Sequence, residues 1–257
     1  MSHGSPRPLA AAKSAPLRGS ARVPGDKSIS HRALIFGALS TGTTRIRGLL
    51  EAEDVLNTAH AVTALGAPAT REDGAWLVRG RGVGGLREPA APSDFGNSGT
   101  GTRLMMGVIA GHPMRVTLIG DASLSRRPMR RVLAPLKSMG LVVEDDRETL
   151  PLTIRGTASL IPIEYALPVP SAQVKSAILI AGLHAAGATT VIETEPTRDH
   201  TERMLAAFGA SITSERRDGR TRITIEGQPN LTGRDITVPG DPSSAAFLAA
   251  AAAIVPG

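Results

Sequence analysis

Three short segments combine glycine, hydroxyl, amide and basic residues at predicted helix starts, where anions bind. In the first, residues 26–32 (DKSISHR), a Pro-Gly turn precedes the helix. Free backbone N–H groups and the helix dipole favour an anion at such a position. Lys27 adds a point charge, the Ser28 hydroxyl can donate, and Arg32, one turn further on, can hold a phosphate with two hydrogen bonds. This motif alone fits an ordinary capped helix with exposed basic residues equally well.

The other two segments have similar chemistry. Residues 97–103 (NSGTGTR) contain glycines that allow a ligand to approach the backbone closely, and residues 171–176 (SAQVKS) supply hydroxyl and amide groups. The basic run 125–131 (SRRPMRR) is typical of a solvated surface, although one arginine at a cleft could bind a carboxylate. Residues 197–202 (TRDHTE) are typical of an N-capped helix start. Each segment alone also fits a turn, a cap or an exposed face without a ligand.

The composition argues against several classes of site. With no cysteine, the chain has no disulfide scaffold, thiolate zinc site or cysteine nucleophile. Its histidines are scattered without an HExxH motif, so we expect no metal site and a structural role for His31. The sequence also lacks GxSxG, P-loop and Rossmann glycine motifs, which removes the usual support for a hydrolase, an NTPase or a dehydrogenase.

The net charge, the aromatic content and the hydropathy limit the classes of molecule that the chain is expected to bind. The formal charge of +6 suits small anionic substrates such as phosphates and carboxylates. Aromatic residues make up only 2% of the chain, which argues against a protein that stacks the bases of single-stranded nucleic acid. Residues 1–18 have no apolar run and are expected to be a frayed tail rather than a signal peptide. Residues 245–255, the longest apolar stretch, are too short to span a bilayer, so we expect a soluble, cytoplasmic protein.

Internal repetition provides the elements that must position these segments. Three predicted helices end in a glycine, at Gly66, Gly140 and Gly209, where a left-handed residue is favoured. Alternating stretches after these glycines predict strands at residues 75–78, 150–154 and 222–225. Small apolar helices are predicted earlier in each repeat, and once more at the end, at residues 30–39, 102–110, 174–183 and 245–254. Short strands are predicted after the first three of these helices, at residues 43–46, 115–119 and 189–192.

Each repeat is therefore a βαβαββ unit of about 70 residues. One unit cannot bury its apolar helix alone, so three complete units are predicted to pack as a compact α/β lobe. A fourth unit stops at Gly257, just after its first helix, and we expect that helix to lack the sheet it should cover.

Four segments together resemble the signature motifs of the 5-enolpyruvylshikimate-3-phosphate synthase family, in its bacterial form. They are residues 23–32 (VPGDKSISHR), 96–103 (GNSGTGTR), 120–129 (GDASLSRRPM) and 197–204 (TRDHTERM). Their order and spacing match from about Val23 to the end of the chain. The family fold has two similar lobes of three such units each, with the active site between them.

The resemblance implies an enolpyruvyl transferase-like lobe of three βαβαββ units, with the second lobe mostly missing. Residues 1–21 would be a tail and a strand belonging to the second lobe. Residues 22–238 would form the first lobe, and residues 239–257 the truncated start of the second. The repeats of the first lobe are expected at about 22–94, 95–169 and 170–238.

The resemblance also implies a reaction. The enolpyruvyl group of phosphoenolpyruvate moves to the 5-hydroxyl of shikimate 3-phosphate and phosphate leaves, through a tetrahedral adduct, on the pathway to chorismate and the aromatic amino acids. No cofactor, metal, nucleic acid or membrane takes part, and the parent protein is expected to be a monomer. The family's inhibitor glyphosate packs beside the residue that matches Gly99, and glycine there implies a sensitive enzyme.

Site residues follow position by position from the resemblance. Those that match shikimate 3-phosphate contacts are Lys27, Ser28, Arg32, Ser171, Ala172, Gln173 and Arg198. Those that match phosphoenolpyruvate contacts are Lys27, Asn97, Gly99, Arg127 and Gln173. The family's catalytic acid and base residues lie beyond Gly257, so no catalytic residue is assigned, and we expect binding without turnover.

Two alternatives differ in chemistry. A related enolpyruvyl transferase that acts on a UDP-sugar shares the architecture, but its active-site loop usually carries a cysteine, and this chain has none. A non-catalytic anion-binding lobe would have the same fold and would hold shikimate 3-phosphate without reacting it.

Overall fold

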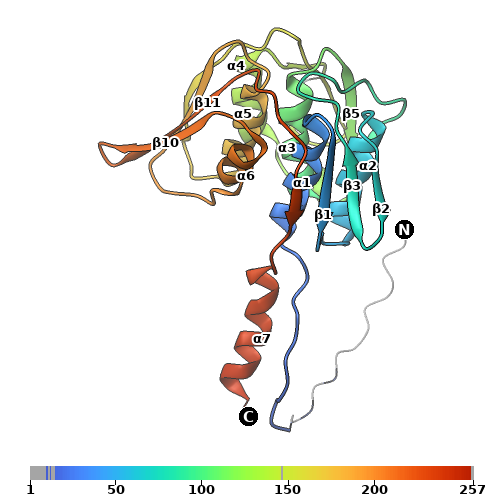
Figure 1. Cartoon of the computed structure of the whole chain (residues 1–257). Coiled ribbons are helices and arrows are strands. Elements are labelled where there is room, and N and C mark those ends of the chain that lie inside the picture. The colour runs from blue at the N-terminus through green and yellow to red at the C-terminus, as the bar shows by residue number, and fades with distance from the viewer. Residues whose placement is uncertain (1–9, 11, 13–14, 146, 256–257) are drawn as a thin grey trace.

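The computed structural model describes residues 10, 12, 15–145 and 147–255 and shows an α/β lobe of three similar units (Figure 1). The helices gather at the centre of the lobe and the strands lie towards its outside (Figure 1). The predicted fold class is confirmed: each unit repeats the order helix, strand, helix and three strands, and this is the predicted βαβαββ order once the last strand is counted with the unit whose sheet it joins.

The elements divide by unit. The first unit contains α1 (Lys27–Leu39), β1 (Thr43–Arg47), α2 (Glu53–Ala64), β2 (Ala69–Glu72), β3 (Ala75–Arg79) and β4 (Ser93–Asp94). The second contains α3 (Gly99–Ala110), β5 (Arg115–Ile119), the 3-10 helix η1 (Leu124–Arg126), α4 (Arg130–Met139), β6 (Val142–Val143), β7 (Leu152–Arg155) and β8 (Glu164–Ala166). The third contains α5 (Ala172–Gly182), β9 (Ala188–Glu193), α6 (His200–Phe208), β10 (Ile212–Arg217), β11 (Arg220–Glu226) and β12 (Asp235–Thr237). Helix α7 (Pro242–Ile254) follows.

The last strand of each unit joins the sheet of another unit. Among the described residues the sheets have the orders β12-β1-β3-β2, β4-β5-β7-β6 and β8-β9-β11-β10. In each sheet the first pair is parallel and the other pairs are antiparallel. Strand β12 pairs with β1 in the register Arg45↔Asp235 to Arg47↔Thr237, so the third unit returns to the first and closes the lobe.

The first helix of every unit is buried on nearly all sides. Helices α1, α3 and α5 are apolar around their circumference, which is the pattern of a helix in the centre of a domain. Close approach of α3 to α5 depends on Gly107, where a Cβ would lie 2.4 Å from the Ala177 carbonyl oxygen. These helices therefore form a rigid core that fixes where their N-termini lie.

The helices begin two to three residues earlier than hydrophobic periodicity predicts. Their N-caps are Asp26, Ser98 and Ser171, whose side chains accept backbone N–H groups of the first turn. The first turn of each helix carries polar residues or glycine, so the apolar pattern begins only after it. The left-handed glycines at the helix C-termini were predicted correctly, since Gly66, Gly140 and Gly209 have φ values of +97°, +116° and +104°.

Helix α7 projects away from the lobe beside the segment that leads to α1 (Figure 1). None of its residues is buried, and Phe247 and Ile254 are 81% and 80% exposed, as expected for a helix without its sheet. Residues 15–21, expected to include a strand of a second lobe, belong to no strand in the structure, and that assignment stays a prediction. No helix among the described residues has the length and apolar character to cross a membrane.

Candidate functional site

The N-termini of α1, α3 and α5 meet at a pocket of about 480 Å³. Its lining residues are Lys27, Ser28, Arg32, Thr100, Ala172, Gln173, Pro196, Thr197, Arg198 and His200. All residues predicted to contact shikimate 3-phosphate are in this set except Ser171, which is the N-cap of α5. Segments more than 140 residues apart in the chain, at Arg32 and Gln173, therefore share one site.

The pocket is built for anions. Three helix N-termini direct their dipoles and free N–H groups towards it, and Lys27, Arg32 and Arg198 add positive charge. No carboxylate is among the described residues that line it. The Lys27 ammonium lies 3.0 Å from Asp54 Oδ2, and about half of the lysine side chain is exposed. That ion pair is worth little at this exposure, so the lysine can turn to a ligand.

Arg32 is the most firmly held of these cations. Its side chain is buried, and it donates from Nε to Thr201 Oγ1 at 2.7 Å, from Nη1 to the Ser28 carbonyl at 2.9 Å and from Nη2 to Ser176 Oγ at 2.7 Å. All of these acceptors are neutral, so they orient the guanidinium without cancelling its charge. Two of its five N–H groups remain for a ligand. Burial lowers the pKa of Arg32 to about 10, which leaves it charged at neutral pH.

Gln173 links this pocket to a second basic cluster. Its amide Nε2 donates to Thr100 Oγ1 at 2.9 Å, and Thr100 lies in the first turn of α3 next to Gly99. On the other side of Gly99, the Arg127 guanidinium donates to Asn97 Oδ1 and to Ser123 Oγ. Asn97, Gly99 and Arg127, all predicted for phosphoenolpyruvate, therefore lie together.

The second cluster, made of Asn97, Arg103, Arg127 and Arg131, carries an excess of positive charge. Burial, followed by the charges of Arg127 and Arg131, lowers the pKa of Arg103. Among the described residues, none of these arginines has a carboxylate within ion-pair distance. The Asp121 carboxylate lies beside the cluster. Asn97 Nδ2 donates to it, and a hydrogen bond from the Leu124 N–H, with a smaller contribution from the charge of Arg127, lowers its pKa. Of the basic run 125–131, Arg127 is hydrogen-bonded to Asn97, and Arg131 acts on the cluster through its charge.

Substituting Gly99 with alanine is expected to weaken phosphoenolpyruvate binding more than it destabilises the fold. The new methyl group would lie 2.8 Å from Arg103 Nη1 and 3.1 Å from Arg127 Nη1, both ends of flexible side chains. We expect the free energy of unfolding to change by less than about 1 kcal/mol. Displacement of Arg127 should weaken phosphoenolpyruvate binding roughly tenfold, the worth of one charge-assisted hydrogen bond. Titration of phosphoenolpyruvate with shikimate 3-phosphate present measures this, and an unchanged affinity would contradict the placement of Arg127.

Several pocket residues were missed by sequence reasoning. Thr100, Pro196, Thr197 and His200 line the pocket but were not predicted as site residues. The signal for Thr100 was its place in the glycine-rich helix start, and the others adjoin Arg198 in a segment interpreted first as a cap. His31 does not line the pocket: its buried ring lies with Nδ1 2.8 Å from Thr58 Oγ1, which fits the structural role predicted for it.

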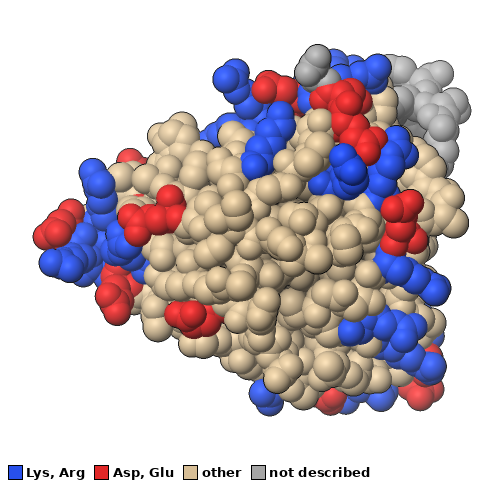
Figure 2. Space-filling view, turned by 90° about the horizontal axis from the view of Figure 1, so that it is seen from above, with Lys and Arg blue, Asp and Glu red and all other residues tan. Residues whose placement is uncertain are grey.

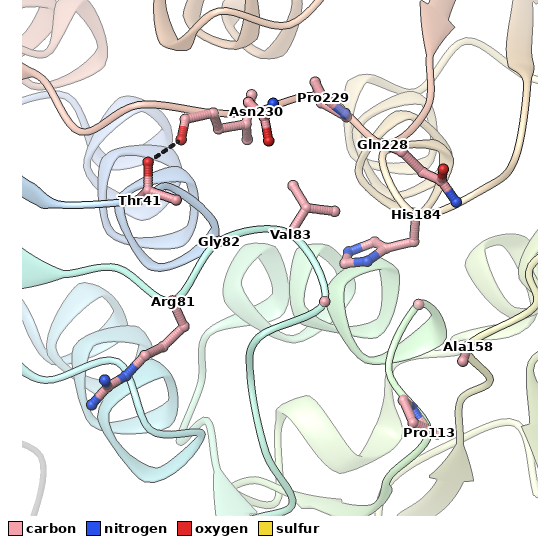
Figure 3. Close-up of a pocket in the computed structure, with 13 residues that line it drawn as sticks. Thr41, Arg81, Gly82, Val83, Pro113, Ala158, His184, Gln228, Pro229 and Asn230 are labelled. Carbon is pink, nitrogen blue, oxygen red and sulfur yellow. Dashed lines mark hydrogen bonds between the residues drawn. The ribbon is translucent and has the colours of Figure 1, made fainter.

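A larger cavity, of about 600 Å³, lies at the opposite ends of the same helices (Figure 3). It is lined by residues of the loops that follow α1, α3 and α5, such as Thr41, Gly111 and His184. Arg81, its charged residue, directs its guanidinium away from the opening and donates to the Gly66 carbonyl (Figure 3). Seen from the end opposite α7, charged residues gather at the margin and uncharged residues occupy the centre (Figure 2). Among the described residues that line this cavity no cation faces the opening, so the cavity does not suit an anionic substrate.

No group of three or more potential metal ligands occurs among the described residues. The residues predicted for shikimate 3-phosphate and those predicted for phosphoenolpyruvate form two adjoining basic sites, which the Gln173–Thr100 hydrogen bond joins. Such an arrangement can hold two anionic molecules next to each other.

Comparisons with known proteins agree with this geometry. A family model described as EPSP synthase (3-phosphoshikimate 1-carboxyvinyltransferase) matches residues 11–257. Relatives named 3-phosphoshikimate 1-carboxyvinyltransferase include those of Afipia carboxidovorans, 62% identical over 262 residues, and Methylorubrum populi, 57% identical over 265 residues. Each alignment covers 100% of this chain and 59% or 58% of the relative.

A solved structure agrees as well. The EPSP synthase of Acinetobacter baumannii superimposes with a TM-score of 0.84 at 45% identity, over 93% of this chain and 54% of that one. The chain therefore spans just over half the length of the relatives that it matches. Family model, relatives and fold lead to one conclusion: the chain belongs to the EPSP synthase family.

Proposed function

We propose that this chain supplies the shikimate 3-phosphate site of an EPSP synthase and part of its phosphoenolpyruvate site. The observation that carries the proposal is the pocket at the N-termini of α1, α3 and α5, where Lys27, Arg32 and Arg198 meet without a lining carboxylate. Shikimate 3-phosphate has a phosphate and a carboxylate, and this pocket offers cations and N–H donors for both. The neighbouring Asn97–Arg127 pair would hold the second anion.

The chemistry assigns each site a task. In the proposed reaction the 5-hydroxyl of shikimate 3-phosphate adds to C2 of phosphoenolpyruvate while C3 gains a proton, and the adduct then loses phosphate and a proton. Arg32 and Lys27 would fix the phosphosugar, and Gln173, hydrogen-bonded to Thr100, would stand between the two substrates. Holding both reactants in one orientation removes much of the entropy cost of a bimolecular step.

Proton transfer needs groups that this pocket does not offer. No carboxylate lines the described pocket, and burial together with the charge of Arg32 lowers the pKa of His200, so its imidazole is largely neutral at pH 7. We infer that this chain by itself binds shikimate 3-phosphate without turnover, which makes it a non-catalytic anion-binding lobe when alone. A missing general acid or base typically costs about 10²–10⁴ in rate.

The proposal extends to the organisation of the whole protein. We propose that residues 22–238 form one of two lobes, with the repeats at about 22–94, 95–169 and 170–238. Residues 239–257 and the strand expected within residues 1–21 would belong to the other lobe. The exposed apolar side chains of α7 support this assignment. The whole enzyme is proposed to work as a cytoplasmic monomer on small molecules, without cofactor, metal, nucleic acid or membrane.

A thermal melt of the 257-residue chain tests the binding proposal. Saturating shikimate 3-phosphate should raise the midpoint, because a ligand at 100 times its dissociation constant stabilises the folded state by about 2.7 kcal/mol. Shikimate without the phosphate is the matched control and should give a much smaller shift. A cooperative melt that does not move would contradict the proposal. Phosphate release that depends on both substrates would contradict the absence of turnover.

A further inference from the structure

A buried charge cluster lies behind one wall of the pocket. Lys175, in the second turn of α5, is 1% exposed, and its Nζ lies 3.0 Å from Glu193 Oε2 and 2.6 Å from Glu202 Oε1. The two glutamate side chains are 3% and 11% exposed. Lys175 is one of the largest side chains that the lobe buries completely, so this ammonium is fixed in place.

The two glutamates stand at the two ends of one loop. Glu193 is the last residue of β9 and Glu202 lies in the first turn of α6. Residues 194–199 between them carry Pro196, Thr197 and Arg198 into the pocket wall. Through a single ammonium group, Lys175 therefore joins the start and the end of the segment that brings these residues to the site.

Little else holds this loop. Residues 194–198 make no backbone hydrogen bond with the rest of the described chain. The Thr197 hydroxyl donates to Glu193 Oε1, the second oxygen of the carboxylate that binds Lys175. Arg198 is exposed and has no hydrogen bond or ion pair among the described residues, so the position of its guanidinium depends on where the loop places its backbone. A loop with so few contacts is expected to move unless its ends are fixed.

The net charge of the cluster is compensated by an arginine of the pocket. Two carboxylates and one ammonium leave one negative charge, and the buried Arg32 guanidinium supplies the compensating positive charge. Glu202 Oε2 is buried without a hydrogen-bond partner, so this carboxylate acts on Arg32 through its charge and not through a direct bond. Removing the lysine alone would leave buried carboxylates in excess, which is strongly destabilising.

We propose that Lys175 is a positioning residue that clamps residues 194–199 at both ends and thereby sets Arg198 in the pocket. Its consequence for binding rests on the proposed function, whereas the clamp itself does not. Lys175 does not line the pocket. Its ammonium forms ion pairs with the two glutamates, so it affects a ligand only through the positions of Thr197 and Arg198.

The variant that tests the clamp is the double substitution Lys175→Met with Glu193→Gln, in which the amide oxygen at position 193 can still accept the Thr197 hydroxyl. It removes one positive and one negative charge, so Glu202 and Arg32 remain as a balanced pair and the lobe is expected to fold. Lys175→Arg is the conservative counterpart, which keeps the charge and can bind both carboxylates. Each variant is first shown to be folded by its circular-dichroism spectrum and by a cooperative thermal melt.

The first readout needs no ligand. Amide ¹⁵N order parameters of Thr197 and Arg198 should be about 0.85 in the unaltered chain and in Lys175→Arg, and below about 0.6 in the double variant. The turn at Gly219, between β10 and β11, serves as the internal reference and should not change. Order parameters that stay high in the folded double variant would overturn the clamp, whatever the pocket binds.

The second readout separates positioning from loss of structure. In the unaltered chain, Arg198→Ala should weaken shikimate 3-phosphate binding about tenfold or more, and in the double-variant background by about twofold or less. Ser28→Ala is the control, since Ser28 lies on α1 and its penalty should be the same in both backgrounds. A full Arg198 penalty in the double variant would overturn the proposal. Loosening of the loop in a chain that does not bind shikimate 3-phosphate would uphold the clamp and refute the proposed function.

Discussion

Arg32→Met is expected to weaken shikimate 3-phosphate binding by a factor on the order of 10³. The guanidinium is buried and held by the Ser28 carbonyl and by the Thr201 and Ser176 hydroxyls, so its position at the pocket is fixed before a ligand binds. A ligand therefore gains a charge-assisted contact without ordering the side chain. Removing one partner of such a desolvated charge pair costs about 2–5 kcal/mol, and every 1.4 kcal/mol is tenfold in affinity.

Two companion variants separate affinity from stability. Arg32→Met leaves the Glu202 charge without its counterpart, so the variant is also expected to lose about 3–5 kcal/mol of unfolding free energy. Adding Glu202→Gln should restore most of that stability, because Lys175 and Glu193 remain as a balanced pair, while affinity stays low.

Arg32→Lys keeps the charge and loses the planar fork, and is expected to bind at an intermediate level. Isothermal titration and urea unfolding of the same samples measure both quantities. Recovery of affinity together with stability in the double variant would show that Arg32 acts on the fold alone.

Local signals in the sequence were sufficient for the repeated unit. The glycines at 66, 140 and 209 occupy left-handed positions that side chains avoid, and the apolar helices bury themselves whatever surrounds them. Helix starts were placed late because caps such as Asp26 carry no hydrophobic signal. The pairing of β12 with β1 joins residues 190 positions apart, at Arg45 and Asp235, and no local pattern specifies such a contact.

In the site, too, local sequence signals were sufficient for some residues, whereas long-range contacts were not predictable. Motif residues at helix starts were predicted to line it, and the structure brings Lys27, Arg32 and Gln173 into one pocket. Lys175 was visible only as a basic residue inside an apolar helix, because its two glutamates come from a strand end and from another helix. Buried ion clusters are made by tertiary packing, so residue type alone does not reveal them.

The lobe is expected to lose stability steeply between pH 7 and pH 5. Burial lowers the pKa of His31 to about 3, and burial with the charge of His112 lowers the pKa of His184 to about 3, against an ordinary value of 6.5. The folded lobe therefore holds both imidazoles neutral, whereas the unfolded chain takes up protons below pH 6.5. Stability is full above that value and falls as the pH drops towards 3.

The expected size follows from proton uptake by the unfolded chain. At pH 5 an unfolded histidine is almost fully protonated, so each buried histidine costs about 2 kcal/mol relative to pH 7, and the pair about 4 kcal/mol. This loss depends mainly on the unfolded value, since a native pKa of 3 is already far below pH 5. The loss is a large part of the 5–15 kcal/mol by which a domain is stable.

Comparing a histidine variant with the unaltered chain separates the histidine contribution to the pH dependence of stability from that of the carboxylates. His184→Gln removes one titrating ring, so urea unfolding at pH 7 and pH 5 should show the stability gap between variant and unaltered chain shift by about 2 kcal/mol in favour of the variant. His60→Gln, at an exposed position, is the matched control for the histidine-to-glutamine change. Parallel curves for His184→Gln would contradict the lowered pKa of His184 and would mean that its imidazole, which lines the cavity of Figure 3, takes up a proton in the folded lobe as easily as in the unfolded chain.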